Sequence, residues 1–141
     1  MLRRLREGPS HTVYSGITLS QPGSDRILTA VAETQITMRR YSDAEISSYV
    51  ASGDPMDKAG AYAIQNSAFQ PVAWLQGCYA NVMGLPLCHV TRCLRSLGVH
   101  PPRDVPTACQ AHNGYHCPVH AQILNAQSTT PPQAAGLVPD L

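Results

Sequence analysis

A short tract near the C-terminal end holds five side chains that could bind a metal. Cysteine thiolates and imidazole nitrogens are ligands that Zn²⁺ prefers, and four of them complete a closed structural shell. The spacing differs from that of paired Cys-x2-Cys motifs, and no hairpin pattern flanks it. The five side chains are Cys109, His112, His116, Cys117 and His120. The tract is consistent with a small zinc-binding protein, or with a polar extension that carries scattered histidines and reduced cysteines.

Two segments with alternating apolar residues predict a β-hairpin ahead of this tract. Residues 11–20 and 26–38 are rich in Val, Ile and Thr and repeat with period two, as strands do. Residues 21–25 have the composition of a turn. The alternation places these residues on one face of each strand: Val13, Ser15, Ile17 and Leu19 in the first, and Leu28, Ala30, Ala32, Ile36 and Met38 in the second.

A helix over about 43–51 follows, with start and stop signals at its two ends. Ser42 and Glu45 fit a capping box, in which each side chain satisfies a free backbone N–H of the first turn. Gly53 can adopt the left-handed conformation after the helix, and Pro55 prevents its continuation. We therefore expect a short helix that ends before the next loop.

The sequence after this helix predicts three further secondary-structure elements. Residues 57–65 suit a short helix or turn, residues 71–76 a strand, and residues 85–97 a second helix, which Gly98 ends. Cys88 and Cys93 on that helix are typical of small buried apolar positions. Hydrophobic periodicity is lost from His100 onward.

The chain therefore divides into three parts. Residues 1–98 form the folded part, residues 99–126 a Cys/His/Pro-rich extension, and residues 127–141 a flexible tail.

Four stretches of the folded part follow one family pattern in order and spacing. Residues 11–16 read HTVYSG, residues 33–38 ETQITM, residues 49–65 YVASGDPMDKAGAYAIQ and residues 77–87 GCYANVMGLPL. They resemble, in turn, the strand after the LSG turn, ETxVxF, YVASGEPxDKAGAYGIQG and GxYxNVVGLPL of the Maf family of nucleoside triphosphate pyrophosphatases. The resemblance covers about residues 5–98, and a run of this length is far more specific than a single short motif.

The resemblance implies a fold and an activity. Maf proteins have an α/β fold similar to that of inosine triphosphatases, with a mixed sheet, flanking helices and a cleft between two lobes. They hydrolyse a nucleoside triphosphate to the monophosphate and pyrophosphate with a divalent metal, Mg²⁺ or Mn²⁺. Residues 79–82, Tyr-Ala-Asn-Val, are similar to the dTTP/UTP-type subgroup.

The matched stretches resemble only the C-terminal half of the family. The family's SxSPRR, DTVV and GKP segments supply phosphate-binding groups and the aspartate base, and none of them is found in these residues. Arg3 and Arg4 stand directly before the HTVYSG stretch, so they are not a displaced SPRR, and the N-terminal basic cluster suits a solvated terminus. No catalytic residue can be assigned on this basis.

Two matched positions suit substrate binding. Gln65 occupies the position of a family glutamine near the base and phosphates, where an amide can both accept and donate hydrogen bonds. Its alternative role is a polar residue at the end of a short helix. Lys58 can serve a phosphate as a point charge, or it can brace the loop by pairing with Asp57 or Asp54. These two carboxylates could also attract Mg²⁺, although capping and turn roles suit them better.

The match departs from the family at two positions. Ala63 and Asn66 stand where the family has glycine. If either position needs a positive φ, Asn tolerates it far better than Ala, so Ala63 puts the local loop geometry in question.

The composition limits the classes of partner and compartment that we expect for the chain. The net charge of +1 provides no strong field for nucleic acid or an anionic membrane, and no apolar run is long enough to span a bilayer. Five cysteines without a secretion signal favour reduced thiols in the cytoplasm. The hairpin and the last helix would leave apolar faces open without the other lobe, which favours self-association, for example as a homodimer.

Three functions therefore stay open. The first is a Maf-type pyrophosphatase that acts on dTTP, UTP or modified nucleotides and needs the other lobe. The second is an inactive fragment that serves at most as a binding or dimerisation module. The third is the small zinc-binding protein.

Overall fold

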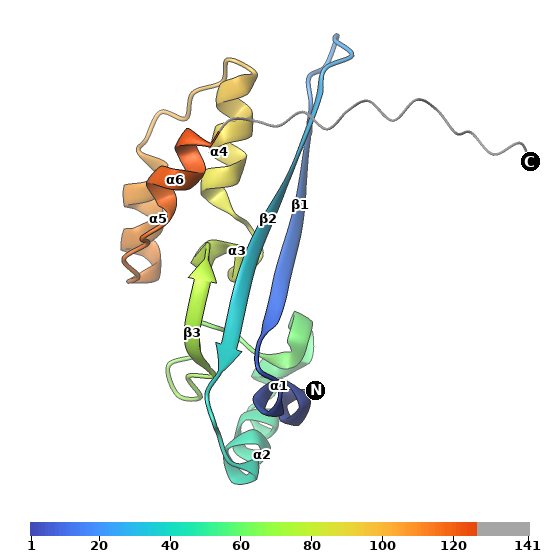
Figure 1. Cartoon of the computed structure of the whole chain (residues 1–141), viewed down its shortest axis with the longest axis vertical. Helices are drawn as coiled ribbons and strands as arrows, with labels where there is room; N and C mark the ends of the chain where they lie inside the picture. Colours follow the sequence, from blue (N-terminus) through green and yellow to red (C-terminus); the bar gives the residue numbers. More distant parts are fainter. Residues whose placement is uncertain (127–141) are drawn as a thin grey trace, which may run out of the picture.

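A three-stranded sheet organises the protein. The computed structural model describes residues 1–126, and the tail predicted at 127–141 lies outside them. Strands β1 (His11–Ser20) and β2 (Ile27–Met38) form the predicted hairpin, and β3 (Val72–Gly77) pairs with one end of β2 (Figure 1). The α/β class is confirmed, but every strand pair in the described residues is antiparallel, so the mixed sheet is not present there.

One face of the sheet is buried under helices. Alternate β2 residues on this face are fully or almost fully buried, as the period-two pattern predicts. Helices α3 (Tyr79–Met83) and α4 (Leu87–Ser96) contact it, and α1 (Leu2–Glu7) contacts β2 as well. Helix α4 is the predicted second helix, whereas α3 was not predicted.

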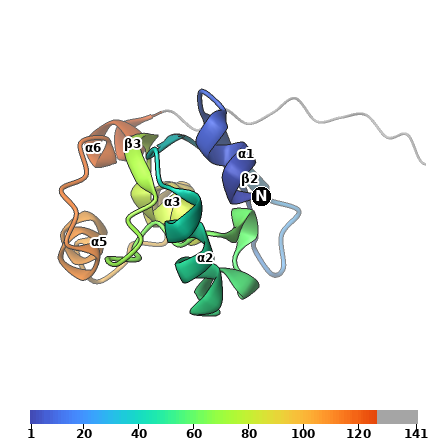
Figure 2. The ribbon, with the colours of Figure 1, turned by 90° about the horizontal axis from the view of Figure 1, so that it is seen from below.

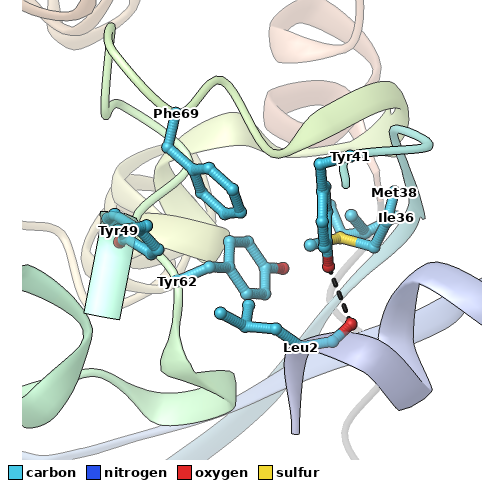
Figure 3. Packing of buried hydrophobic residues seen from close by; sticks show 7 residues of the cluster. All are labelled: Leu2, Ile36, Met38, Tyr41, Tyr49, Tyr62 and Phe69. Atoms are coloured by element: carbon cyan, nitrogen blue, oxygen red, sulfur yellow. Dashed lines mark hydrogen bonds between the residues drawn. The ribbon is translucent and has the colours of Figure 1, made fainter. Parts of the chain in front are cut away.

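An aromatic cluster forms the main core at the end of the sheet near the N-terminus. Helix α1 (Leu2–Glu7) and helix α2 (Asp43–Ala51) enclose it (Figure 1). Figure 3 shows the rings of Tyr41, Tyr49, Tyr62 and Phe69 gathered in one cluster, with Leu2 at its edge. The rings of Tyr49 and Phe69 stack with centroids 4.2 Å apart. The predicted capping box of α2 is confirmed, with both reciprocal hydrogen bonds formed.

The basic N-terminus is not simply a solvated end, which corrects the sequence-based expectation. Residues 2–7 form α1, and its Leu2 is only 4% exposed. Arg6 donates to the Tyr41 carbonyl at 2.9 Å and to Asp43 Oδ1 at 2.8 Å. These distant contacts hold a helix that is too short to be stable alone.

The extension also folds, although hydrophobic periodicity is lost there. Helices α5 (Val105–Asn113) and α6 (His120–Asn125) both contact α4. Asp104 caps α5 by accepting from the Thr107 N–H at 2.8 Å. Figure 2 shows α5 and α6 on the opposite side of the molecule from α1. None of the helices in residues 1–126 is long and apolar enough to cross a membrane.

The second face of the sheet is open. The register places Tyr14, Val31, Ile27 and Trp74 on this face, and each is at least half exposed, from 51% for Trp74 to 63% for Tyr14 and Ile27. Exposed apolar side chains grouped in this way commonly mark an interaction surface.

We predict that the chain self-associates through this open face. Val31→Glu should shift the protein toward the monomer, because a buried charge opposes burial of the face. The matched control is Val50→Glu on α2, another exposed valine, 47% accessible, that lies off the sheet. Light scattering coupled to gel filtration measures both variants. A native chain that is monomeric at all accessible concentrations contradicts the prediction.

Candidate functional site

The loop after α2 carries the residues predicted to bind substrate, and Tyr49 holds it in place. The Tyr49 hydroxyl donates to Asp54 Oδ2 at 2.5 Å and accepts from the Ala63 N–H at 3.0 Å. Asn66 Nδ2 donates to the same Asp54 oxygen at 3.2 Å. The hydrogen bond from Tyr49 is the largest influence that lowers the pKa of Asp54. One carboxylate thus joins the beginning and the end of the loop.

Lys58 braces this loop from inside. Its ammonium group donates to the Asp54 carbonyl oxygen and to Asp57 Oδ1, both at 2.8 Å, and lies 3.4 Å from Asp54 Oδ1. The hydrogen bond to Asp57 is the main cause that raises the pKa of Lys58. The structure therefore contains the bracing contacts considered for Lys58, while its role toward a phosphate stays a prediction.

Gln65 is placed differently from Lys58. It lies in a turn, its side chain is exposed, and it makes no hydrogen bond with any residue in 1–126. The structure does not join Gln65 to Lys58 by a hydrogen bond. A free amide at the end of a braced loop is available to a ligand.

The two departures from the family pattern cause no backbone strain. The described non-glycine residues with positive φ are Ala61 and Gln70, and neither Ala63 nor Asn66 is among them. Asn66 instead supports the loop, because its Oδ1 accepts from the N–H groups of Ala68 and Phe69 at 3.1 and 2.7 Å.

A buried polar cluster fixes the last matched segment, residues 77–87, onto the hairpin. Thr34 is fully buried, and its hydroxyl accepts from the Cys78 N–H and donates to the Cys78 carbonyl, both at 3.1 Å. Asn81, 1% exposed, donates to Thr34 Oγ1 and to the Val13 carbonyl, also at 3.1 Å. Gly77 allows this approach, because a Cβ there would lie 2.7 Å from the Glu33 carbonyl oxygen.

Sequence reasoning missed this cluster, although a signal was present. The apolar face predicted for residues 26–38 is interrupted at one inward position, Thr34. A polar residue at an inward strand position requires a buried hydrogen-bond partner. The partners are distant in sequence, so the pattern could not name them.

The five zinc candidates do not come together as a metal site. Cys109, Cys117 and His120 line one small apolar cavity with Cys78 and Cys88, whereas His112 and His116 do not line it. In residues 1–126, no three His, Cys, Asp or Glu side chains are arranged to hold a metal ion. Asp54, one of the two carboxylates considered for Mg²⁺, is engaged by Tyr49, Asn66 and Lys58, and the requirement for Mg²⁺ or Mn²⁺ stays a prediction.

Comparison with known proteins gives the family. The model of the family described as Maf-like protein matches residues 1–97. The chain belongs to the Maf family. Relatives named dTTP/UTP pyrophosphatase from Salinibacter ruber, Dehalococcoides mccartyi and Geobacter sulfurreducens are 52%, 47% and 47% identical over 97, 94 and 98 residues, respectively.

The alignments cover only part of this chain and only part of each relative. Those alignments cover 67–70% of this chain and 42–51% of the relatives, so the chain spans about half the length of the curated relatives it matches. The braced loop and the Thr34–Asn81 cluster both lie within the Maf-family part. Helices α5 and α6 lie beyond residue 97 and outside the family match.

We expect Thr34→Val to destabilise the Maf-family part by about 1–3 kcal/mol, because it leaves buried donors and an acceptor at Cys78 and Asn81 without a partner. Thr37→Val is the matched control, since Thr37 is on the same strand and its side chain makes no hydrogen bond within residues 1–126. Urea unfolding curves give both free energies. Equal stability of the two variants would contradict the assigned role of Thr34.

We also expect the buried thiols to resist alkylation. Burial raises the pKa of Cys88 to about 12 and raises the pKa of Cys78. The thiolate is the reactive form, so both should react with a maleimide at pH 7.5 far more slowly than half-buried Cys117. Peptide mapping by mass spectrometry resolves the order. Denaturant should remove the difference, and equal rates in the folded protein would refute the prediction.

Proposed function

We propose that this chain is the C-terminal half of a dTTP/UTP-type Maf pyrophosphatase and forms one wall of its nucleotide cleft. The proposal rests chiefly on Gln65, a matched position whose amide is exposed and unpaired while its neighbours are held by Tyr49 and Asp54. The names of the relatives from Salinibacter ruber and Dehalococcoides mccartyi support the substrate class.

The roles of the residues follow from their chemistry. The Gln65 amide can accept from a base N–H and donate to a phosphate oxygen. Lys58 adds positive charge at a fixed position, because Asp54 and Asp57 orient its ammonium group. The Tyr49–Asp54–Ala63 bonds keep the loop in one conformation before the nucleotide arrives, which reduces the entropic cost of binding.

Hydrolysis needs groups beyond these. Cleavage between the α- and β-phosphates requires phosphate-binding cations and activation of water. The segments that supply them in the family have no counterpart in these residues. We therefore assign nucleotide recognition to this chain and hydrolysis to its assembly with the other lobe, in a reducing compartment such as the cytoplasm, where its five unpaired cysteines suit the conditions.

The second candidate function is an inactive binding module. It differs from the first in that no assembly with the other lobe restores catalysis.

Titration of the full chain with dTTP, followed by NMR, tests the proposal. Gln65→Ala should weaken binding about five- to tenfold, the loss of roughly one net hydrogen bond. Gln21→Ala in the exposed hairpin turn is the control and should bind as the native chain does. If dTTP does not bind, or if Gln65→Ala binds equally well, the proposed cleft wall is wrong.

Release of pyrophosphate from dTTP with Mg²⁺ or Mn²⁺ separates the remaining alternatives. The chain alone should release it no faster than buffer. Addition of the unmatched half of the Salinibacter ruber relative should restore activity if the first function holds. Continued inactivity with bound dTTP would favour the binding module.

A further inference from the structure

A polar groove lies where the Maf-family part meets the extension. The end of β3, the adjoining part of β2, α4 and α6 line it, and its volume is about 480 Å³. Ligand sites for small molecules typically span about 300–1,000 Å³. Its polar walls are formed by Glu33, Gln76, His89, Arg92 and Gln122. None of these residues belongs to the loop of the proposed nucleotide site.

Arg92 brings an unneutralised positive charge to this groove. Its Nη1 donates to the Ile123 carbonyl at 3.2 Å, but its Nε is buried and has no hydrogen-bond partner. None of the salt bridges within residues 1–126 includes Arg92. A buried donor without an acceptor is costly, and an oxyanion that accepts from a guanidinium forms a strong charge-assisted bond.

His89 adds a second unsatisfied atom beside Arg92. It is one helical turn before Arg92 on α4, is 8% exposed, and its Nδ1 is buried without a partner. Burial, and then the charge of Arg92, lowers the pKa of His89, so the imidazole is neutral at pH 7. Its ring can therefore form a hydrogen bond in the groove without adding charge.

The opposite wall carries the opposite charge. Glu33 is exposed on β2 and forms no salt bridge with Arg92, although both line the groove. The amides of Gln76 and Gln122 are also exposed, and neither makes a side-chain hydrogen bond within residues 1–126. Arg92 and Glu33 carry opposite charges, line the same groove and form no ion pair with each other. This arrangement suits a ligand with a hydrogen-bond acceptor at one end and a donor at the other.

We propose that this groove binds a small molecule that carries an oxyanion, with Arg92 holding its phosphate or carboxylate and Glu33 accepting from hydroxyl or amino groups at its other end. The site is independent of the proposed nucleotide site. It depends on α6, which lies outside the family match.

Calorimetric titration of the full chain with inorganic phosphate, acetate and ribose 5-phosphate tests the site. Arg92→Gln should weaken phosphate binding by about tenfold or more, because it removes the charge. Arg95→Gln, an exposed arginine on the same helix that does not line the groove, should leave it unchanged. Phosphate tighter than acetate assigns a phosphate site, and the reverse assigns a carboxylate site.

Glu33→Gln provides a test that does not depend on the packing of Arg92. It removes a like charge from the wall, so it should tighten phosphate binding several-fold. Ribose 5-phosphate should bind the native chain more tightly than phosphate does, and Glu33→Gln should reduce that advantage. Absence of phosphate binding by the native chain, or equal binding by Arg92→Gln, overturns the proposal and leaves water as the partner of the unsatisfied atoms. Gln65→Ala should bind phosphate normally here, which distinguishes failure of this site from failure of the nucleotide site.

Discussion

The Thr34 hydroxyl joins two matched segments that are distant in the chain, residues 33–38 and residues 77–87. A hydroxyl has one proton to donate and two lone pairs to accept, and here all three are used, by the Cys78 carbonyl, the Cys78 N–H and the Asn81 amide. In a fully buried position all three hydrogen bonds are needed, because each missing one would leave a buried polar group without a partner and destabilise the fold. The chain turn from β3 into α3 is therefore set at one place on β2, and α4 follows from there.

The braced loop after α2 depends on a different kind of constraint. Its acidic and basic side chains are mostly within reach of solvent, so their ion pairs contribute little stability individually. Tyr49 fixes the conformation of the loop. Its ring packs in the aromatic core, while its hydroxyl forms hydrogen bonds with Asp54 and Ala63 in the loop. Core packing thus determines the position of a polar surface loop through one side chain that belongs to both.

These two arrangements explain which features could be predicted from sequence. The hairpin, the capping box of α2 and the contacts of Lys58 with Asp54 and Asp57 involve residues close together in the chain, so local patterns contain them. Helix α1 could not be predicted, because contacts of Leu2 and Arg6 with distant residues form it. The sheet direction and the partners of Thr34 are likewise long-range. Family resemblance alone pointed to Gln65, whose exposed position gives no local signal.

The extension carries five side chains of the types that bind Zn²⁺, but they do not gather in one place within residues 1–126. Cys109 and Cys117 do converge, but onto an apolar cavity that they share with buried Cys78 and Cys88. Burial raises the pKa of Cys78 and of Cys88, and thiols in such surroundings pack as small apolar groups. The stacked rings of Tyr79 and Tyr115, with centroids 4.7 Å apart, close the same region. The cysteines thus attach α5 to the Maf-family part through burial. Of the three buried side-chain polar atoms without a partner in residues 1–126, Asn81 Oδ1 lies in the Thr34 cluster, and His89 Nδ1 and Arg92 Nε lie on α4, where α6 approaches. The extension therefore packs against α4 in two ways. Helix α5 forms an apolar contact, whereas α6 lines a polar groove, and the groove is where we propose that a ligand binds.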